Sequence, residues 1–356
     1  MDGFLELIPM REDERIDPDK VGAALEGALP LGEGIPEILQ FEGGKANLTY
    51  LLRYSQADGS QQEYVLRRPP LGPVAPKSHD MAREYKVLSR LNPAYPLAPM
   101  AYHFSEDPSV VGAPFLVMER RRGIVIRKEL PERFRNQPDL NRRIGEMIVD
   151  GLVDLHGVDP EAVSLSDLGR AEGFMVRQVQ GWAGRWENAK TVEVPLFYEL
   201  QAWLENNLPE PPRVSLVHND FKLDNMMVEA DDPSKAVAVF DWDMCTLGDP
   251  LADLGTLLGY WTEASDSEDR TAFAVMPTNQ PGFPTRDEVV ERYARRSGMD
   301  LANIAWYEVF AIWKTAVVIQ QIYVRWHRGQ TKDDRFKTYG KRAIHLIELA
   351  ERIRSH

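Results

Sequence analysis

The chain has 356 residues, 43% of them hydrophobic and 27% charged, so it can bury a sizeable core and is not a disordered polymer. Its formal net charge of −13 argues against nucleic acid as the main partner. Cys245 is the only cysteine, which excludes an internal disulfide and a thiolate metal cluster.

The first third of the chain is predicted to consist mainly of short strands. Residues 1 to about 35 form a leader with one weak helix at Pro18–Leu29, and a second helix is predicted at His79–Leu91. Asp58 and Gly59 are suited to a hairpin turn. The predicted strands are Ile38–Phe41, Thr49–Tyr54, Glu63–Arg67 and Phe115–Met118.

After Glu119 the pattern becomes mainly helical, and Thr285 or Asp287 is suited to cap one of the later helices. The prediction is therefore an α+β fold, with a small β-rich lobe at residues 1–119 and a larger helical lobe at residues 120–356. The helices are predicted at Asp139–His156, Phe197–Leu208, Thr285–Ser297, Ile304–Arg328 and Asp334–Ile353.

No segment is predicted to enter a membrane. The most apolar late stretch, Val309–Tyr323, is too short to span a bilayer and is interrupted by Lys314. The N-terminus has no basic region followed by an apolar run, so no secretory signal is predicted. We therefore expect a cytoplasmic protein without a membrane partner.

The most informative segment is a polar loop bracketed by short apolar runs that are predicted to be a pair of strands. Asp220 lies in this loop, Asn225 follows five residues later, and Asp241 ends a further apolar run. Phosphoryl transfer needs such a set, because one carboxylate must lie near the attacking hydroxyl while other oxygens hold Mg²⁺ on the phosphates of ATP. We predict Asp220 as the catalytic base, Asn225 and Asp241 as Mg²⁺ ligands, and His218 as a brace for the loop. A plain turn, which Asp and Asn also favour, is the competing interpretation.

Two glycines between strands are suited to cover the phosphates of a nucleotide. Gly43 and Gly44 permit close approach of the backbone, and Lys45 or Asn47 would lie nearby. The competing interpretation is an ordinary hairpin.

A basic residue and an acidic residue follow in the order that kinase chemistry requires. Arg67 ends a strand, and Glu84 on the next helix could pair with it and hold it toward the phosphates. Met118 and Glu119 end the strand where the two lobes should meet, and in a kinase the backbone there hydrogen-bonds adenine. The competing interpretation for Arg67 and Glu84 is a surface ion pair.

Several charged residues near these motifs allow two interpretations. Asp243 is either a second carboxylate on the metal side or a structural acceptor, whereas Asp249 and Asp253 are expected to hold backbone amides. The basic run Arg120–Lys128 is either a solvated turn or a site for an anionic substrate group. The aromatic stretches Trp182–Trp186 and Trp306–Tyr323 are expected to pack in the core rather than line a substrate cavity.

On these motifs the chain resembles the aminoglycoside phosphotransferase and choline kinase superfamily, and the resemblance implies a protein-kinase-like two-lobed fold. Its His-Gly-Asp-x-x-x-x-Asn loop appears as His218–Asn225, and its Asp-Trp-Glu motif appears as Asp241–Asp243. The resemblance runs from about Ile35 to the C-terminus and implies that Asp220 is the base, that Asn225 and Asp241 bind Mg²⁺, and that ATP lies between the lobes. Its motifs are specific to the superfamily and not to a substrate.

A finer resemblance is to the branch that includes the kinase-like domains of some acyl-CoA dehydrogenases. It rests on residues 43–50, 65–70, 79–85 and 115–119 and on the Asp-Trp-Asp motif. This branch is associated with phosphorylation of hydroxyacyl-CoA compounds, and any dehydrogenase working with this chain is expected to be a separate protein. Arg67 stands where many members have lysine, Asn219 replaces the common glycine, and Lys222 lies inside the loop. None of these departures removes a group that the chemistry requires.

The sequence therefore predicts an ATP- and Mg²⁺-dependent kinase that acts on a hydroxyl group of a small metabolite, preferably a hydroxyacyl-CoA or hydroxyacid. One alternative is an aminoglycoside kinase, which would need acids to hold amines. Between Ile304 and Arg328, however, Glu308 is the only acid, against Lys314, Arg325 and Arg328. The other alternative is an ATP-binding regulator with the same fold and negligible turnover.

Overall fold

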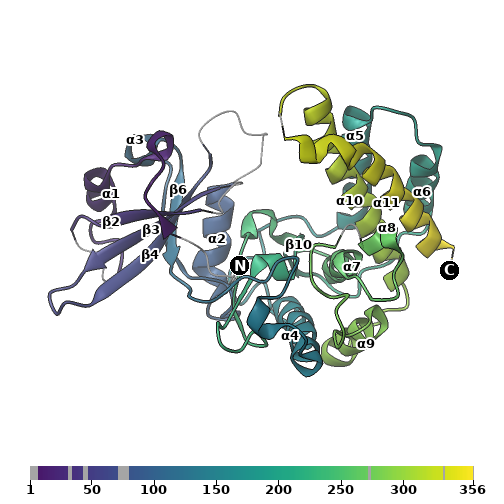
Figure 1. The fold of residues 1–356 in the computed structure, drawn as a ribbon, viewed down its shortest axis with the longest axis horizontal. Helices are drawn as coiled ribbons and strands as arrows, with labels where there is room; N and C mark the ends of the chain where they lie inside the picture. Colours follow the sequence, from purple (N-terminus) through teal and green to yellow (C-terminus); the bar gives the residue numbers. More distant parts are fainter. Residues whose placement is uncertain are drawn as a thin grey trace. The chain divides into compact units, whose positions relative to one another are not determined.

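The computed structural model describes residues 7–30, 34–42, 47–70, 80–271, 274–331 and 333–355. The chain divides into two compact units (Figure 1). Unit 1 comprises Met1–Arg135, Glu161–Leu165 and Leu223–Cys245, and unit 2 comprises Asn136–Pro160, Ser166–Lys222 and Thr246–His356. The N-terminal part is β-rich and the C-terminal part is helical, which confirms the predicted α+β fold. The lobe boundary expected at residue 119 stays a prediction.

Unit 1 is built on a six-stranded antiparallel sheet in the order β1-β2-β3-β4-β6-β5. Side chains alternate across its faces, so that Tyr50 and Leu52 of β3 and Leu66 of β4 are buried in one cluster. Gly59, with φ of 81°, closes the predicted hairpin between β3 and β4. The strands are β1 Leu7–Ile8, β2 Glu37–Phe41, β3 Leu48–Ser55, β4 Gln61–Arg68, β5 Ala101–Ser105 and β6 Phe115–Glu119.

Three helices accompany this sheet: α1 Pro18–Leu25, α2 Met81–Leu91 and α3 Pro108–Val111. Helix α2 begins after Asp80, whose side chain accepts a hydrogen bond from the Arg83 amide at 3.0 Å. It packs against β5 and β6 and buries Glu84 together with its apolar side chains. A buried carboxylate on a core-facing helix requires a partner, and it has one in the candidate active site.

The strands around the predicted catalytic loop do not pair with each other, contrary to the expectation of one strand pair. In unit 2, β7 (Ser215–Val217) pairs with β10 (Thr246–Gly248). In unit 1, β8 (Met226–Val228) pairs with β9 (Ala236–Val239). The chain thus leaves unit 2 after Lys222 and returns to it at Thr246.

Unit 2 is mostly helical, and α10 packs against α5, α7 and α11 (Figure 1). Trp186, Phe197 and Trp313 stack with ring centroids 4.3 and 4.7 Å apart, as expected for core aromatics. None of the helices in the described ranges is long and apolar enough to cross a membrane. The helices are α4 Pro138–His156, α5 Phe174–Ala189, α6 Pro195–Asn206, α7 Pro250–Tyr260, α8 Glu268–Thr271, α9 Arg286–Ser297, α10 Ile304–His327 and α11 Tyr339–Arg354.

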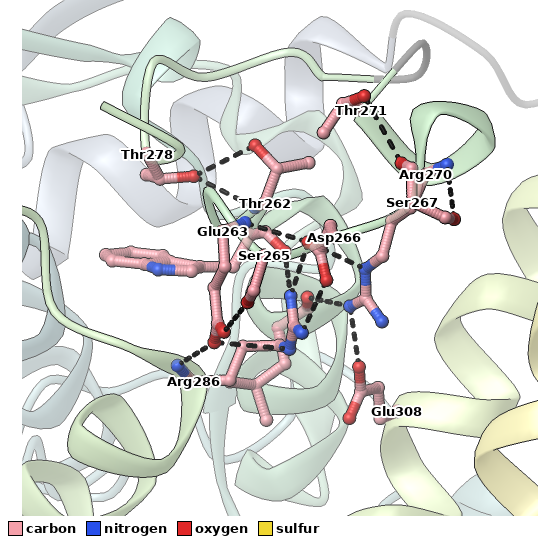
Figure 2. Close-up of polar contacts among 12 residues, drawn as sticks. Thr262, Glu263, Ser265, Asp266, Ser267, Arg270, Thr271, Thr278, Arg286 and Glu308 are labelled. Atoms are coloured by element: carbon pink, nitrogen blue, oxygen red, sulfur yellow. Dashed lines mark hydrogen bonds and ion pairs between the residues drawn. The ribbon is translucent and has the colours of Figure 1, made fainter. Parts of the chain in front are cut away.

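Ion pairs stabilise the segment between α7 and α9, as Figure 2 shows. Arg286 makes a bidentate pair with Asp266 at 2.7 and 2.8 Å, and Arg270 reaches Glu308 of α10 at 2.8 Å. Thr285 caps α9 in a capping box with Glu288, which confirms it as one of the two predicted caps. Charge pairs thus connect the described residues between α7 and α9, including Arg270 of the short helix α8, to one another and to α10.

Candidate active site

Asp220, the predicted base, lies in unit 2 between a cation and a phenol. The Lys222 ammonium is 2.6 Å from Asp220 Oδ2, and the Tyr260 hydroxyl donates to Oδ1 at 3.1 Å. Burial and the Asp220 charge raise the pKa of Tyr260 well above its usual value, so its hydroxyl remains a donor. A carboxylate held in this way has its orientation fixed before any substrate arrives.

Asp253 of α7 holds the backbone of the loop that carries Asp220. Its Oδ2 accepts from the His218 amide at 2.6 Å and its Oδ1 from the Asn219 amide at 2.7 Å. Asn219 has φ of 69°, a left-handed conformation that glycine and asparagine adopt more easily than other residues. This explains why asparagine can replace the common glycine. The amide-holding role predicted for Asp253 is confirmed, and Asp249 likewise holds the Leu251 amide at 3.0 Å.

Two buried histidines complete the support beneath the loop. His218 is fully buried, and its Nδ1 accepts from the Asp220 amide at 3.3 Å, as expected of a brace. His156 of α4 places Nε2 3.3 Å from Asp253 Oδ2 and Nδ1 2.7 Å from the Tyr293 hydroxyl. Burial lowers the pKa of His156 although Asp253 opposes this shift. Burial works against ionisation of Asp253, but its contacts with His156 and His218 lower its pKa.

The two predicted metal ligands lie at the ends of the β8–β9 pair in unit 1. Asn225 directly precedes β8, Asp241 is the second residue after β9, and the Phe240 amide donates to the Asn225 carbonyl at 2.8 Å. Asp241 has φ of 69°, and the fully buried Trp242 donates its indole N–H to the Val239 carbonyl at 2.7 Å. The strand pairing therefore brings the backbones of Asn225 and Asp241 side by side.

Arg67 connects the helix carboxylate to Asp241. Its Nη1 is 2.5 Å from Glu84 Oε1 and its Nη2 is 2.7 Å from Asp241 Oδ1. Burial raises the pKa of Glu84 to about 7, against the opposing Arg67 charge, with Asp241 and Asp243 adding to the rise. Glu84 is fully buried, so the competing interpretation of a surface ion pair is wrong. Asp243 is part-exposed in the short 3-10 helix Trp242–Met244 that follows Asp241.

The structure gives fewer contacts for the remaining residues that were predicted to bind nucleotide. Gly43 and Gly44 lie outside the described residues. Asn47 is buried just before β3. Met118 and Glu119 end β6, where the Glu119 amide donates to the Met100 carbonyl at 2.9 Å and its carboxylate accepts from the Met100 amide at 2.8 Å.

The basic run after β6 is largely paired within unit 1. Arg121 contacts Glu119 at 2.5 Å, Arg122 contacts Glu63 at 2.8 Å, and Arg127 contacts Asp224 at 3.2 Å. These contacts favour a structural role for the run over an anion site.

The oxygen donors present fit a magnesium ion. A carboxylate and an amide side chain are hard ligands, and Mg²⁺ in proteins is bound through few protein groups, with water and substrate phosphates completing its shell. Within the described ranges no cluster of three or more His, Cys, Asp or Glu side chains is arranged to hold a metal ion. That Asn225 and Asp241 hold Mg²⁺ stays a prediction.

Sequence reasoning missed two residues near Asp220, namely Tyr260 and Lys314. Lys314 Nζ donates to the Asn219 carbonyl at 3.2 Å. The sequence contained a signal for Lys314, because a lysine within a mostly apolar helix is rarely buried unless its ammonium has a polar partner. Tyr260 ends α7, which was not predicted as a helix.

Most of the chain is similar in sequence to known proteins. The model of the phosphotransferase enzyme family matches residues 37–305. Acyl-CoA dehydrogenase family member 10 of Mus musculus is 32% identical over 347 residues, which cover 96% of this chain and 31% of that protein. Family member 11 of Gallus gallus is 29% identical over 362 residues, which cover 97% of this chain and 45% of that protein. The chain thus spans less than half the length of these relatives.

Solved structures share the fold. A protein of Ralstonia eutropha JMP134, provisionally described as an aminoglycoside phosphotransferase, has a TM-score of 0.81 and 26% identity, with 95% of this chain and 98% of that chain covered. The GDP and kanamycin complex of APH(2")-IIIa has a TM-score of 0.59 and 12% identity, with 93% and 97% covered. An ADP and hygromycin B complex of APH(4)-Ia has a TM-score of 0.57 and 15% identity, again with 93% and 97% covered. The last two resemblances concern the fold alone.

Proposed function

This chain belongs to the phosphotransferase enzyme family, and we propose that it transfers the γ-phosphoryl group of ATP to a hydroxyl group of a small metabolite in a Mg²⁺-dependent reaction. The observation that carries the proposal is the fixed carboxylate of Asp220, oriented by Lys222 and Tyr260 on a backbone that Asp253 holds. The cytoplasm is the location we propose. Nucleotide binding is supported by similar folds solved with GDP and ADP.

The proposed mechanism relies on positioning and charge. Asp220 accepts the hydrogen bond of the acceptor hydroxyl and orients its oxygen for attack, and Lys222 offsets negative charge beside it. Asn225 and Asp241 would hold Mg²⁺, which neutralises phosphate charge when bound. Arg67, held by Glu84, supplies a guanidinium toward the phosphates.

We assign the nucleotide-covering role to residues 1–119, including Gly43, Gly44 and Asn47, with Met118 and Glu119 beside adenine. Residues 120–356 carry the catalytic and metal loops and the acceptor site in this proposal.

For the acceptor we propose a hydroxyacyl-CoA or hydroxyacid. The support is the similarity to acyl-CoA dehydrogenase family members over nearly all of this chain. An aminoglycoside acceptor is less favoured, because the one acid of α10, Glu308, is paired with Arg270.

The experiment that tests the function is ADP release from Mg·ATP with hydroxyacyl-CoAs, hydroxyacids, sugars, choline and aminoglycosides as acceptors. We expect turnover with one acceptor class, and Asp220→Ala should abolish it while ATP binding, followed by calorimetry, stays nearly intact. Turnover that persists in Asp220→Ala would refute the assigned base. ATP binding without turnover across the panel would favour the alternative of a non-catalytic ATP-binding regulator.

A further inference from the structure

We infer that Lys314 and Arg185, arranged about the Trp182 ring, form the acceptor subsite of unit 2 and bind an anionic group of the acceptor. The inference rests on the proposed function and names the substrate class, namely hydroxylated compounds that carry a carboxylate or phosphate. The three residues come from two packed helices, Trp182 and Arg185 from α5 and Lys314 from α10.

Lys314 lies directly beside the candidate base. Its Nζ is 3.2 Å from the Asn219 carbonyl oxygen, which belongs to the peptide group that joins Asn219 to Asp220. An ammonium has three donors, and this contact uses one of them. Within the part of the chain that the structure describes, no carboxylate forms an ion pair with Lys314.

Arg185 is an exposed cation of α5 that contacts the same aromatic ring as Lys314. Its guanidinium lies 4.1 Å from the centre of the Trp182 ring, and Lys314 Nζ lies 5.6 Å from that centre. Arg185 likewise forms no ion pair with a carboxylate of the described residues. Two cations thus share one indole, an arrangement that cation–π attraction favours although the two charges repel each other.

An anion would remove this repulsion. Burial lowers the pKa of Lys314, although Asp220 and Asp253 oppose the shift, and Arg185 and Lys222 add to it. Lys314 is part-buried, so a charge-assisted hydrogen bond to it is worth more than one at the surface. The apolar face of Trp182 is suited to the carbon chain between the anionic group and the hydroxyl.

Binding of a cationic acceptor is disfavoured at this subsite. A cationic acceptor would meet Lys314, Arg185 and Lys222 near Asp220, and like charges at short distance repel. The subsite therefore discriminates by repulsion as well as attraction.

The test measures binding separately from turnover. The probes are 3-hydroxybutyrate, its neutral primary amide, and 3-hydroxybutyryl-CoA, each titrated into the full chain with ligand-observed NMR. The variants are Lys314→Met, the conservative Lys314→Arg, and Arg325→Met. The last is a matched control, because Arg325 is an exposed cation on the same helix.

We expect the wild type to bind the acid more tightly than the amide. Lys314→Met should weaken acid binding by about tenfold to a hundredfold and leave the amide unchanged, whereas Lys314→Arg and Arg325→Met should keep the preference. If the CoA thioester shows the same loss, its phosphates supply the anion, and if only the free acid does, the carboxylate supplies it. Either outcome supports the subsite.

Equal affinity for acid and amide in the wild type would overturn the inference, as would a preference that survives Lys314→Met. Phosphoryl transfer to a neutral or cationic acceptor, unaffected by Lys314→Met, would also overturn it while leaving the proposed function intact. Conversely, a charge preference that depends on Lys314 in a protein without turnover would refute the proposed function and leave the subsite standing.

Discussion

Replacing Asp253 by asparagine tests whether this carboxylate positions the catalytic loop as well as stabilising unit 2. Both carboxylate oxygens of Asp253 accept backbone amides, at 2.6 Å from His218 and 2.7 Å from Asn219. In Asp253→Asn one oxygen becomes an NH₂ group that faces an N–H donor. One buried amide then lacks an acceptor, which lowers the free energy of unfolding by about 1–3 kcal/mol. The other hydrogen bond is no longer made to a charged oxygen, which lowers it by about 1 kcal/mol more.

The expected loss of about 2–4 kcal/mol corresponds to a fall in Tm of about 5–15 °C, because a unit of this size loses about 2–4 °C per kcal/mol. We also expect kcat to fall by about tenfold to a hundredfold, since a displacement of about 1 Å in a reacting group has an effect of this order. The assays are differential scanning calorimetry and steady-state ADP release with the acceptor found in the panel.

Asp249→Asn is the matched control. Asp249 is buried and caps the same helix, but it accepts from the Leu251 amide and, at 2.5 Å, from the Tyr307 hydroxyl. An asparagine can keep both contacts, because its oxygen can accept from the amide while its NH₂ group donates to the hydroxyl. We expect a smaller fall in Tm and an unchanged kcat. The reasoning is refuted if Asp253→Asn leaves kcat within about twofold of the wild type.

Three further outcomes follow from the structure. Asn219→Gly should leave Tm nearly unchanged, whereas Asn219→Val should lower stability by about 1–3 kcal/mol in urea unfolding, because valine is strained at φ of 69°. Equal stabilities would contradict this. Arg286→Ala should cost about 3–5 kcal/mol, since it leaves the buried Asp266 carboxylate without its bidentate partner, and the exposed control Arg295→Ala should cost under about 1 kcal/mol. Because burial lowers the pKa of His156, the unfolded state binds more protons, so stability should fall as pH drops below about 6.5, and less steeply in His156→Gln.

The elements that the sequence predicted well are those with clear local signals. Helix α9 has a capping box at Thr285, and α4 has Pro138 at its first position and a regular apolar face. Helix α7 was missed because all residues from Pro250 to Leu258 are buried, which leaves no polar face to give a period. Helix α5 was missed because Gly173 provides no side-chain cap and two further glycines lower its helical propensity.

The candidate site likewise contains residues that the sequence predicted and contacts that it did not. The spacing of Asp220, Asn225 and Asp241 is visible in the sequence because the three residues lie within one short stretch. The contact of Arg67 with Asp241 joins residues 174 positions apart, and Tyr260 reaches Asp220 across 40 positions. Such contacts depend on how helices and strands pack, which no local pattern records.

The path of the chain also bears on how the protein is made. A chain that has been synthesised only to residue 222 contains all six strands of the large sheet, but it lacks the β8–β9 pair that completes unit 1. At the same point β7 is present without β10, its partner in unit 2. The β8–β9 pair of unit 1 and the β7–β10 pair of unit 2 therefore both await the stretch that ends at Gly248. We expect a fragment ending before this stretch to keep open strand edges and aggregate. Unit 1 has all its residues once the chain reaches Cys245, whereas unit 2 needs the chain up to His356, so unit 1 should be the first to complete its fold on the ribosome.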